Sequence, residues 1–264
     1  MRMESIKVTF LGTGNAVPTK LRNHTAILVS TGSNTLLVDC GEGTQRQFKQ
    51  AHLSPHKITH LLITHLHGDH VLGIPGLFQT LAMSNYQKTL NIYGPKGTKN
   101  FIKTLEKLHK EFKIKTLVKE VSGKFLKTDT IELEASSMNH GTPTLAFSIS
   151  LKDKLRLKKD KLKKLKLPNS PLIKPLLKGK NIKHKGKTIK AKDLTYLQKG
   201  KKLTIILDTK ENPNTIKLAK DSDLLITESS FSEKEKDKAA IYKHLTAKQS
   251  AQIAKKAKVK ALAL

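Results

Sequence analysis

Residues 64–70 (THLHGDH) gather four side chains that bind metal ions in proteins: His65, His67, Asp69 and His70. They directly follow the apolar run 58–64, and burying so many polar groups is unfavourable unless something binds them. Neutral imidazoles with a carboxylate suit Zn²⁺. His65 and His67 can face the same way from an extended loop and hold one ion. Gly68 permits a sharp turn, after which Asp69 and His70 diverge and can serve a second ion.

Two metals need more ligands, and three further residues stand at the ends of apolar runs. His140 comes just past residues 131–136, and Asp208 closes residues 203–207 and can bridge both ions through its two oxygens. Asp39 ends residues 34–39 and is either a ligand or the partner of a histidine N–H. Six further histidines have no comparable neighbours, so we expect them on the surface or in the core: His24, His52, His56, His60, His109 and His184.

Short apolar segments punctuated by glycine must position these residues. Their periodicity predicts strands over 6–12, 24–31, 34–39, 58–64, 90–93, 131–136, 145–151, 203–207 and 224–228. Helices are predicted over 44–51, 71–83, 98–111, 213–220 and 246–256, with Pro75 breaking or kinking the second. Strands mixed with helices of this length indicate an α/β sandwich with one core.

The 264 residues carry a formal net charge of +29, which indicates a polyanionic partner. Residues 151–190 hold 15 lysines and one arginine against two aspartates, a net charge of +14. They keep a helix-like leucine stripe, but Pro168, Pro171 and Pro175 forbid a continuous helix. We expect a protruding basic arm with too small an apolar face for a core of its own. A solvated basic loop is the plainer interpretation.

Composition excludes several classes of protein. No run of about 18 apolar residues exists, which excludes a membrane span, and the first residues lack the apolar core of a signal peptide. A lone Cys40 excludes an internal disulfide framework and fits a reducing cytoplasm. Residues 151–190 contain no Phe, Tyr or Trp, so their lysines favour RNA phosphate over lipid as the partner. Part of the remaining charge reflects a preference for lysine, which outnumbers arginine 46 to 4.

The HxHxDH pattern after an apolar strand resembles the metallo-β-lactamase fold. Four further stretches are similar to the ribonuclease Z family, endonucleases that trim the 3′ end of precursor tRNA. They are residues 18–23 (PTKLRN, like PxKxRN), 39–46 (DCGEGTQR), 228–231 (ESSF, like the HEAT motif) and 244–247 (HLTA, like the HST motif). HxHxDH alone is specific for the superfamily, whereas the set in this order is specific for the ribonuclease Z branch.

The resemblance implies an αββα sandwich of the metallo-β-lactamase type, built from residues 1–150 and 191–264. Residues 151–190 would be the inserted flexible arm that grips tRNA. It implies two Zn²⁺ per subunit, with the first held by His65, His67 and His140, the second by Asp69 and His70, and Asp208 bridging them. The arm lysines expected to contact RNA are Lys158, Lys159, Lys161, Lys163 and Lys164.

The resemblance also implies a reaction. A water activated between the ions would attack the phosphodiester in line, and Asp69 would accept its proton. Glu228 would orient His244, and this pair would protonate the departing oxygen. The products would be a tRNA with a free 3′-hydroxyl and a trailer with a 5′-phosphate. The family acts as a homodimer in which one subunit's arm presents precursor tRNA to the other's active site.

Two departures from the family pattern stand out. The second zinc of the family usually takes one more histidine from a C-terminal Thr-His-Phe-Ser motif, but no histidine follows His244 here. We therefore expect a truncated sequence, with weakened occupancy of the second zinc and reduced turnover. In the arm, residues 168–172 (PNSPL) place Ser170 where the family's Gly-Pro-Leu element has glycine. We therefore do not expect the arm tip to have the geometry found in the family.

Two other functions remain open from the residues. One is a related hydrolase of small phosphodiesters or sulfate esters, which would need no lysine-rich arm. The other is a nucleic-acid-binding relative that keeps the fold but is inactive because its second metal site is incomplete. Without the resemblance, the residues support only metal-assisted hydrolysis of an anionic substrate.

Overall fold

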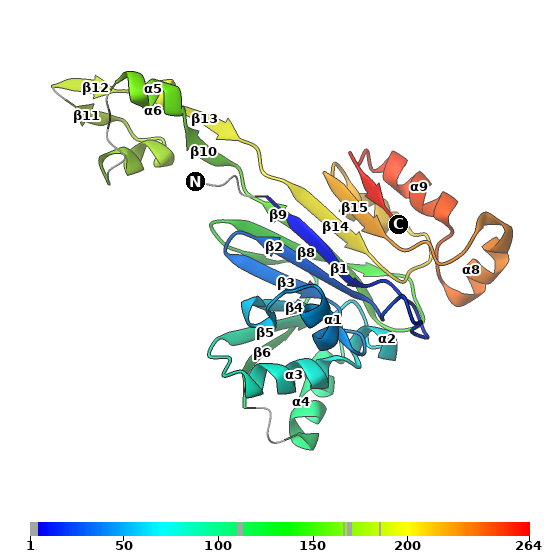
Figure 1. Ribbon diagram of the computed structural model, residues 1–264. Helices are drawn as coiled ribbons and strands as arrows, with labels where there is room; N and C mark the ends of the chain where they lie inside the picture. Colours follow the sequence, from blue (N-terminus) through cyan, green and yellow to red (C-terminus); the bar gives the residue numbers. More distant parts are fainter. Residues whose placement is uncertain (1–4, 110–112, 166, 168–170, 185) are drawn as a thin grey trace.

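A computed structural model describes residues 5–109, 113–165, 167, 171–184 and 186–264. Two sheets pack face to face, helices cover their outer faces, and a slender arm projects from one end (Figure 1). These layers confirm the predicted αββα sandwich. Within the described residues, no helix is long and apolar enough to cross a bilayer.

The first sheet has the strand order β1-β2-β3-β4-β5-β6. Its first three strands are antiparallel and the rest are parallel. The strands are β1 (Lys7–Gly12), β2 (Ala26–Thr31), β3 (Asn34–Val38), β4 (His60–Leu62), β5 (Thr89–Gly94) and β6 (Lys115–Glu120). Gly32 lies in the turn that joins β2 to β3 and has a positive φ of 61°, which glycine adopts without strain.

The second sheet has the order β16-β15-β14-β9-β8-β7. Strands β8, β14 and β15 run in the same direction, because β9 is antiparallel to both β8 and β14 while β14 is parallel to β15. The strands are β7 (Gly123–Lys127), β8 (Ile131–Met138), β9 (Thr144–Leu151), β14 (Lys202–Ile206), β15 (Leu224–Thr227) and β16 (Leu262–Ala263).

Side chains alternate between two apolar layers on each strand. On β2, Ile27 and Val29 pack against the second sheet, where Phe147 and Ile205 belong to the same buried cluster. Leu28 of β2 points the other way, into a cluster under the helices of the first sheet. Because strands such as β2 are buried on both faces, their sequences are continuous apolar runs. The predicted strand boundaries are therefore close to the observed ones.

Helices α1 (Thr44–Gln50), α3 (Ile74–Met83) and α4 (Thr98–Leu108) contribute to the cluster beside the first sheet. Helices α7 (Pro213–Ala219) and α9 (Ala247–Lys256) contribute to the cluster beside the second. The predicted break at Pro75 is found: α2 (Gly68–Val71) ends before it and Pro75 sits in the first turn of α3, where its missing N–H costs nothing. The predicted helix 98–111 ends at Leu108, and residues 110–112 lie outside the described part.

The other short helices outside the arm, among the described residues, are η1 (Pro55–Lys57), η3 (Glu233–Glu235) and α8 (Lys236–Tyr242). The sequence did not predict α8, nor strands β6 and β7. Their side chains are mostly exposed or half-buried, so the apolar periodicity that marks a core-facing element is weak.

The arm begins with a two-stranded ribbon, β10 (Lys154–Leu157) paired antiparallel with β13 (Thr195–Gln198). It continues with α5 (Lys159–Lys164), η2 (Pro171–Lys178), β11 (Ile182–His184), β12 (Lys187–Ile189) and α6 (Ala191–Leu194). The returning strand therefore extends the arm beyond residue 190. Pro168, Asn169 and Ser170, at the expected tip motif, lie outside the described residues.

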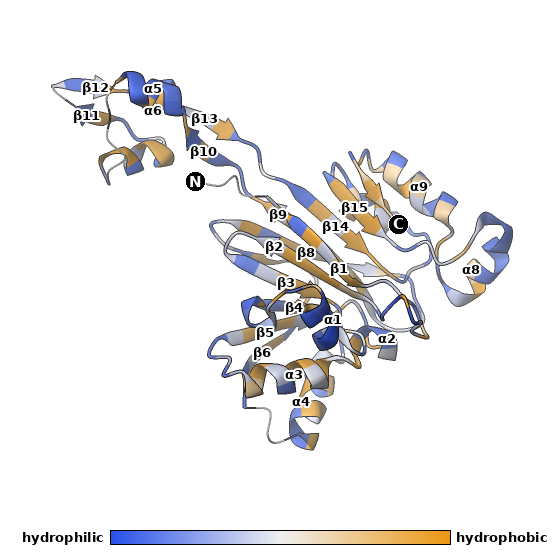
Figure 2. Cartoon of the chain, in the orientation of Figure 1, coloured by the Kyte–Doolittle hydropathy of each residue, from blue (hydrophilic) through white to orange (hydrophobic). Residues whose placement is uncertain are grey.

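The expectation that the arm has no core is wrong. Ile173, Leu176 and Ile182 are buried together with Ala191 and Leu194, and Leu157 and Leu162 pack against them. The lysines of α5 point outward, and Figure 2 shows this helix as mainly hydrophilic. The error came from counting only the leucine stripe of residues 151–165, whereas the cluster joins residues from η2 to α6 that are distant in sequence.

Candidate active site

The residues singled out from the sequence stand at the ends of strands that share one edge of the sandwich. Asp39 follows β3 and His65 follows the neighbouring parallel strand β4. His140, Asp208 and Glu228 follow β8, β14 and β15, which also run in a common direction. Because parallel strands end at the same edge of a sheet, the fold brings these polar side chains together from distant parts of the sequence.

Three histidines form the first group of potential metal ligands. His67 Nδ1 lies 3.1 Å from His65 Nε2 and 3.3 Å from His140 Nε2. His140 Nδ1 lies 3.2 Å from the carbonyl oxygen of Lys243, which only accepts, so this nitrogen carries the proton and Nε2 has a free lone pair. The donor atoms of His65, His67 and His140 lie within 4.8 Å of one another.

His65, His70 and Asp208 form a second group, whose donor atoms also lie within 4.8 Å of one another. The Nε2 atom of His70 is buried and lacks a hydrogen-bond partner. It lies 3.5 Å from Oδ2 of Asp69 and 3.5 Å from Oδ2 of Asp208, too far for a hydrogen bond. An orphaned nitrogen facing two carboxylates is the arrangement that a cation between them would satisfy.

The carboxylate of Asp39 fixes His70 of this second group through hydrogen bonds. Its Oδ2 accepts hydrogen bonds from His70 Nδ1 at 2.6 Å and from the Thr64 hydroxyl at 2.7 Å, while Oδ1 accepts from the Thr64 backbone N–H at 2.7 Å. Asp39 is fully buried and has a φ of +57°, a left-handed conformation that Asp tolerates better than most residues. Of its two roles left open by the sequence, the geometry favours the partner of a histidine N–H.

The pKa values describe the ion-free state of the cluster. Burial, assisted by His70, lowers the pKa of His65 to about 2, so its imidazole is neutral as a ligand requires. Burial acts to lower the pKa of His70, but Asp39 and Asp208 outweigh it and raise that pKa well above its usual range. Burial acts to raise the pKa of Asp208, but His70 and His65 lower it below its usual range.

A second acid–base pair borders the cluster. His244 Nδ1 lies 2.9 Å from Oε2 of Glu228, and Glu228 Oε1 also accepts a hydrogen bond from the Thr209 backbone N–H at 2.8 Å. Burial acts to lower the pKa of His244, but the hydrogen bond and charge of Glu228 outweigh it and raise the pKa. His244 is therefore well suited to carry a proton near neutral pH.

Other residues at the site were not expected from the sequence. A cleft of about 400 Å³ is lined by His67, Asp69, His140, Asp208 and His244 together with Asn15, Ala16, Phe231 and Tyr242. The backbone N–H of Ala16 donates a 2.8 Å hydrogen bond to Asp69 Oδ2, and buried His24 lies 3.3 Å from the Ala16 carbonyl oxygen. Phe231 lay within a recognised motif, but Tyr242 has no motif to mark it, and His24 was expected to have no role.

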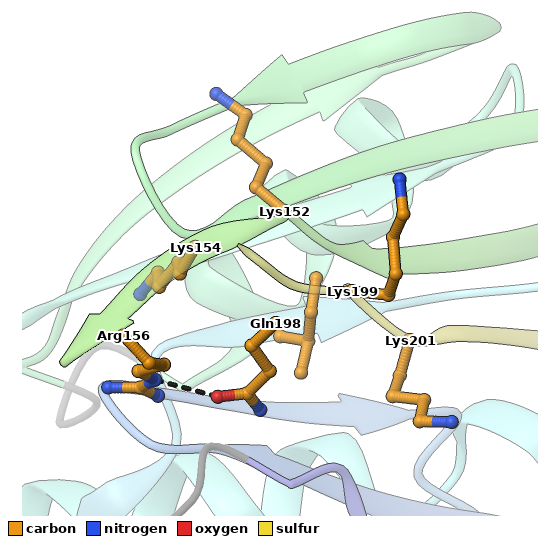
Figure 3. A pocket seen from close by; sticks show the side chains of 8 residues that line it. Lys152, Lys154, Arg156, Gln198, Lys199 and Lys201 are labelled. Carbon is orange, nitrogen blue, oxygen red and sulfur yellow. Dashed lines mark hydrogen bonds between the residues drawn. The ribbon is translucent and has the colours of Figure 1, made fainter. Parts of the chain in front are cut away.

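The arm lysines do not join this cluster. The arm leaves the sheet before β14 begins, whereas Asp208 follows the end of β14, so the arm and the cleft lie at opposite ends of the second sheet (Figure 1). At the arm's root, Lys152, Lys154, Lys199 and Lys201 line one pocket together with Arg156, whose Nε donates a 2.7 Å hydrogen bond to Gln198 Oε1 (Figure 3). The positive charge therefore continues from the arm onto the sandwich.

Comparisons with known proteins agree with this geometry. A family profile described as "Anti-Pycsar protein Apyc1" matches residues 6–174. The chain is 41% identical to "Ribonuclease Z" of Methanocaldococcus jannaschii, across 98% of this chain and 84% of that protein. It is 38% identical to "Ribonuclease Z" of Methanothermobacter thermautotrophicus, across 98% and 85%.

Solved structures show the same fold. The human short-form tRNase Z superposes with a TM-score of 0.73 at 26% identity, covering 97% of this chain and 90% of that chain. The metallo-β-lactamase fold protein YhfI from Bacillus subtilis superposes with a TM-score of 0.69 at 18% identity, covering 98% and 84%. At 18% identity, the similarity to YhfI shows a shared fold and nothing more.

Proposed function

This chain belongs to the ribonuclease Z family, and we propose that it is a metal-dependent endoribonuclease that removes the 3′ trailer from precursor tRNA. Several curated relatives named "Ribonuclease Z" are 35–41% identical to it over nearly its whole length. The Apyc1 profile covers the His65–His70 motif but ends inside the arm, before Asp208, Glu228 and His244. The ribonuclease Z relatives therefore account for more of the site.

The residues at the cleft fit two zinc ions. The orphaned Nε2 of His70, the carboxylates of Asp69 and Asp208, and three converging imidazoles supply the nitrogen and oxygen donors that zinc prefers. We assign His65, His67 and His140 to one ion, Asp69 and His70 to the other, and Asp208 to both. Bound zinc supplies Lewis-acid stabilisation of phosphate charge and lowers the pKa of an attacking water.

The protein's own groups complete the reaction. Asp69 accepts the proton of the attacking water, and its position is fixed by the hydrogen bond from the Ala16 backbone. On the other side of the scissile bond, His244 donates a proton to the leaving 3′-oxygen of the tRNA. Glu228 raises the pKa of His244, which favours its protonated form, and holds its Nδ1, so that Nε2 is the nitrogen left to donate.

The arm binds the body of the tRNA through its phosphates. Lys159, Lys161, Lys163 and Lys164 are exposed on α5, which suits a sequence-independent, salt-sensitive contact. Because the arm and the cleft lie at opposite ends of one sheet, we propose a homodimer in which one subunit's arm serves the other's cleft. The lone buried Cys40 agrees with a cytoplasmic protein.

The observation that carries the proposal is the Glu228–His244 pair beside the histidine–aspartate cluster. A cleavage assay on precursor tRNA with a 3′ trailer, with added zinc and with chelator, tests it. We expect zinc-dependent release of one intact trailer with a 5′-phosphate. Cleavage only of bis-p-nitrophenyl phosphate would favour a small-phosphodiester hydrolase, and binding without cleavage would favour an inactive RNA-binding relative.

A further inference from the structure

Two aromatic side chains at the cleft have no part in the mechanism above. The rings of Phe231 and Tyr242 are parallel within 3°, and their centroids are 6.2 Å apart. Both line the cleft that contains His67, Asp208 and His244. Two parallel aromatic faces beside a phosphodiester-cleaving centre form a surface on which a planar ring can stack.

The two rings differ in how firmly they are held. Phe231 is half-buried, and its backbone is fixed by hydrogen bonds with Leu245 and Ala247 on either side of Thr246. Its ring lies 6.0 Å from the ring of His244. Tyr242 ends helix α8 and is 62% exposed, so much of its ring remains open to solvent. Phe231 thus supports Tyr242, and Tyr242 presents the accessible face.

We propose that Tyr242, backed by Phe231, stacks on a nucleobase of the substrate and positions the scissile phosphate. The inference rests on the proposed function, because the role of His244 identifies which base this is. His244 protonates the 3′-oxygen that remains on the tRNA, and Phe231 lies next to His244. The stacked base is therefore that of the last tRNA nucleotide, rather than the first nucleotide of the trailer.

Stacking lets one site bind tRNAs that differ in this base. Every base has a π-face, so an aromatic platform binds any base without reading hydrogen-bond groups. The arm holds the tRNA body through phosphates at a distance from the cleft, so the arm contact alone does not fix which phosphodiester bond is cleaved. Tyr242 and Phe231 supply a local contact that fixes the position of the cleaved bond.

The test pairs protein variants with RNAs that lack one base. Precursor tRNA is prepared intact, with an abasic last tRNA nucleotide, and with an abasic first trailer nucleotide. For the unaltered protein, we expect kcat/KM to fall about tenfold or more only when the tRNA-side base is absent. Tyr242→Leu should lower kcat/KM on intact RNA by a similar factor. On the RNA that lacks the tRNA-side base, Tyr242→Leu should have the same kcat/KM as the unaltered protein. Tyr242→Phe, which keeps the ring, should behave as the unaltered protein.

Ile241→Ala is the matched control, since Ile241 precedes Tyr242 on the same helix and is 74% exposed. It should cleave all three RNAs at the unaltered rates. Equal losses for Tyr242→Leu on intact and abasic RNA would overturn the inference, as would dependence on the trailer base instead. If the unaltered protein cleaved intact RNA with no dependence on either base, the stacking would be refuted while the proposed function stood. No cleavage of intact RNA would refute both.

Discussion

The carboxylate of Asp39 lies 2.6 Å from His70 Nδ1, and both side chains are buried. The same carboxylate accepts the hydroxyl hydrogen of Thr64, whose oxygen lies 3.0 Å from His65 Nδ1. Since the Thr64 hydroxyl donates to Asp39, it must accept from His65. One aspartate therefore places the proton on Nδ1 of both histidines and leaves both Nε2 atoms free for metal.

Replacing Asp39 with Asn should weaken zinc binding by about 10- to 100-fold. Asn tolerates the positive φ at this position, so the backbone is kept, but its NH₂ group cannot accept from both Thr64 and His70. Thr64→Val should give a smaller loss, because only the link to His65 is removed. Competition with a chromophoric chelator measures both affinities.

Asp129→Asn, at an exposed carboxylate in the turn between β7 and β8, serves as the control for Asp39→Asn. It should bind zinc with unchanged affinity. Unaltered affinity in Asp39→Asn would show that Asp39 does not orient the ligands.

Replacing His244 with Asn should slow cleavage of precursor tRNA more than hydrolysis of bis-p-nitrophenyl phosphate, because the two substrates have different leaving groups. The alkoxide that leaves from RNA needs a proton, whereas p-nitrophenolate leaves without one. We expect turnover of precursor tRNA to fall by about 10²- to 10⁴-fold, with a much smaller loss on bis-p-nitrophenyl phosphate. His67→Ala and Asp69→Ala should abolish turnover of both substrates, because they remove metal ligands. Equal losses for His244→Asn on the two substrates would refute a general-acid role.

Replacing Lys158, Lys159, Lys161, Lys163 and Lys164 with Ala should raise KM for precursor tRNA strongly and make binding less sensitive to salt. Hydrolysis of bis-p-nitrophenyl phosphate should be retained, since the arm lies far from the cleft. A charge-matched control removes five exposed lysines of α4 and β6: Lys99, Lys103, Lys107, Lys115 and Lys119. Equal losses on both substrates in the arm variant would contradict the assignment of the arm.

Removing zinc should lower the thermal stability of the protein. A ligand at about 1,000 times its Kd that binds only the folded state stabilises by about 4 kcal/mol. For a chain of this size, that corresponds to a Tm shift on the order of 10 °C. Calorimetry with chelator, followed by zinc addition, measures the shift, and His140→Ala should diminish it. A Tm independent of zinc would argue against the metal centre.

Asp223 should make the sandwich sensitive to acid. Burial acts to raise its pKa, but hydrogen bonds from Lys260, the Lys202 backbone and Lys201 outweigh it and lower the pKa to about 2. A lowered pKa means that the stabilisation is complete above the ordinary value of 3.8 and is lost as pH falls toward 2. Asp223→Asn should be less stable at pH 7 and lose less stability between pH 4 and 2. Urea unfolding measures this, with exposed Asp237→Asn as the control.

The sequence alone determined the fold class and most of the buried strands, because each such strand is a short apolar run bounded by turns. It also located the ligand candidates, since His65, His67, Asp69 and His70 are adjacent and His140 and Asp208 directly follow apolar strands. These inferences depend on local spacing, which the sequence states directly.

Only the tertiary structure decided what depends on contacts between distant segments. It showed Asp39 bound to His70 and, through Thr64, to His65, and it placed Tyr242 beside Phe231. It also revealed the small core of the arm, which joins η2 to α6. Such contacts arise where packed elements meet, and the spacing of residues along the chain does not encode which side chains will face one another there.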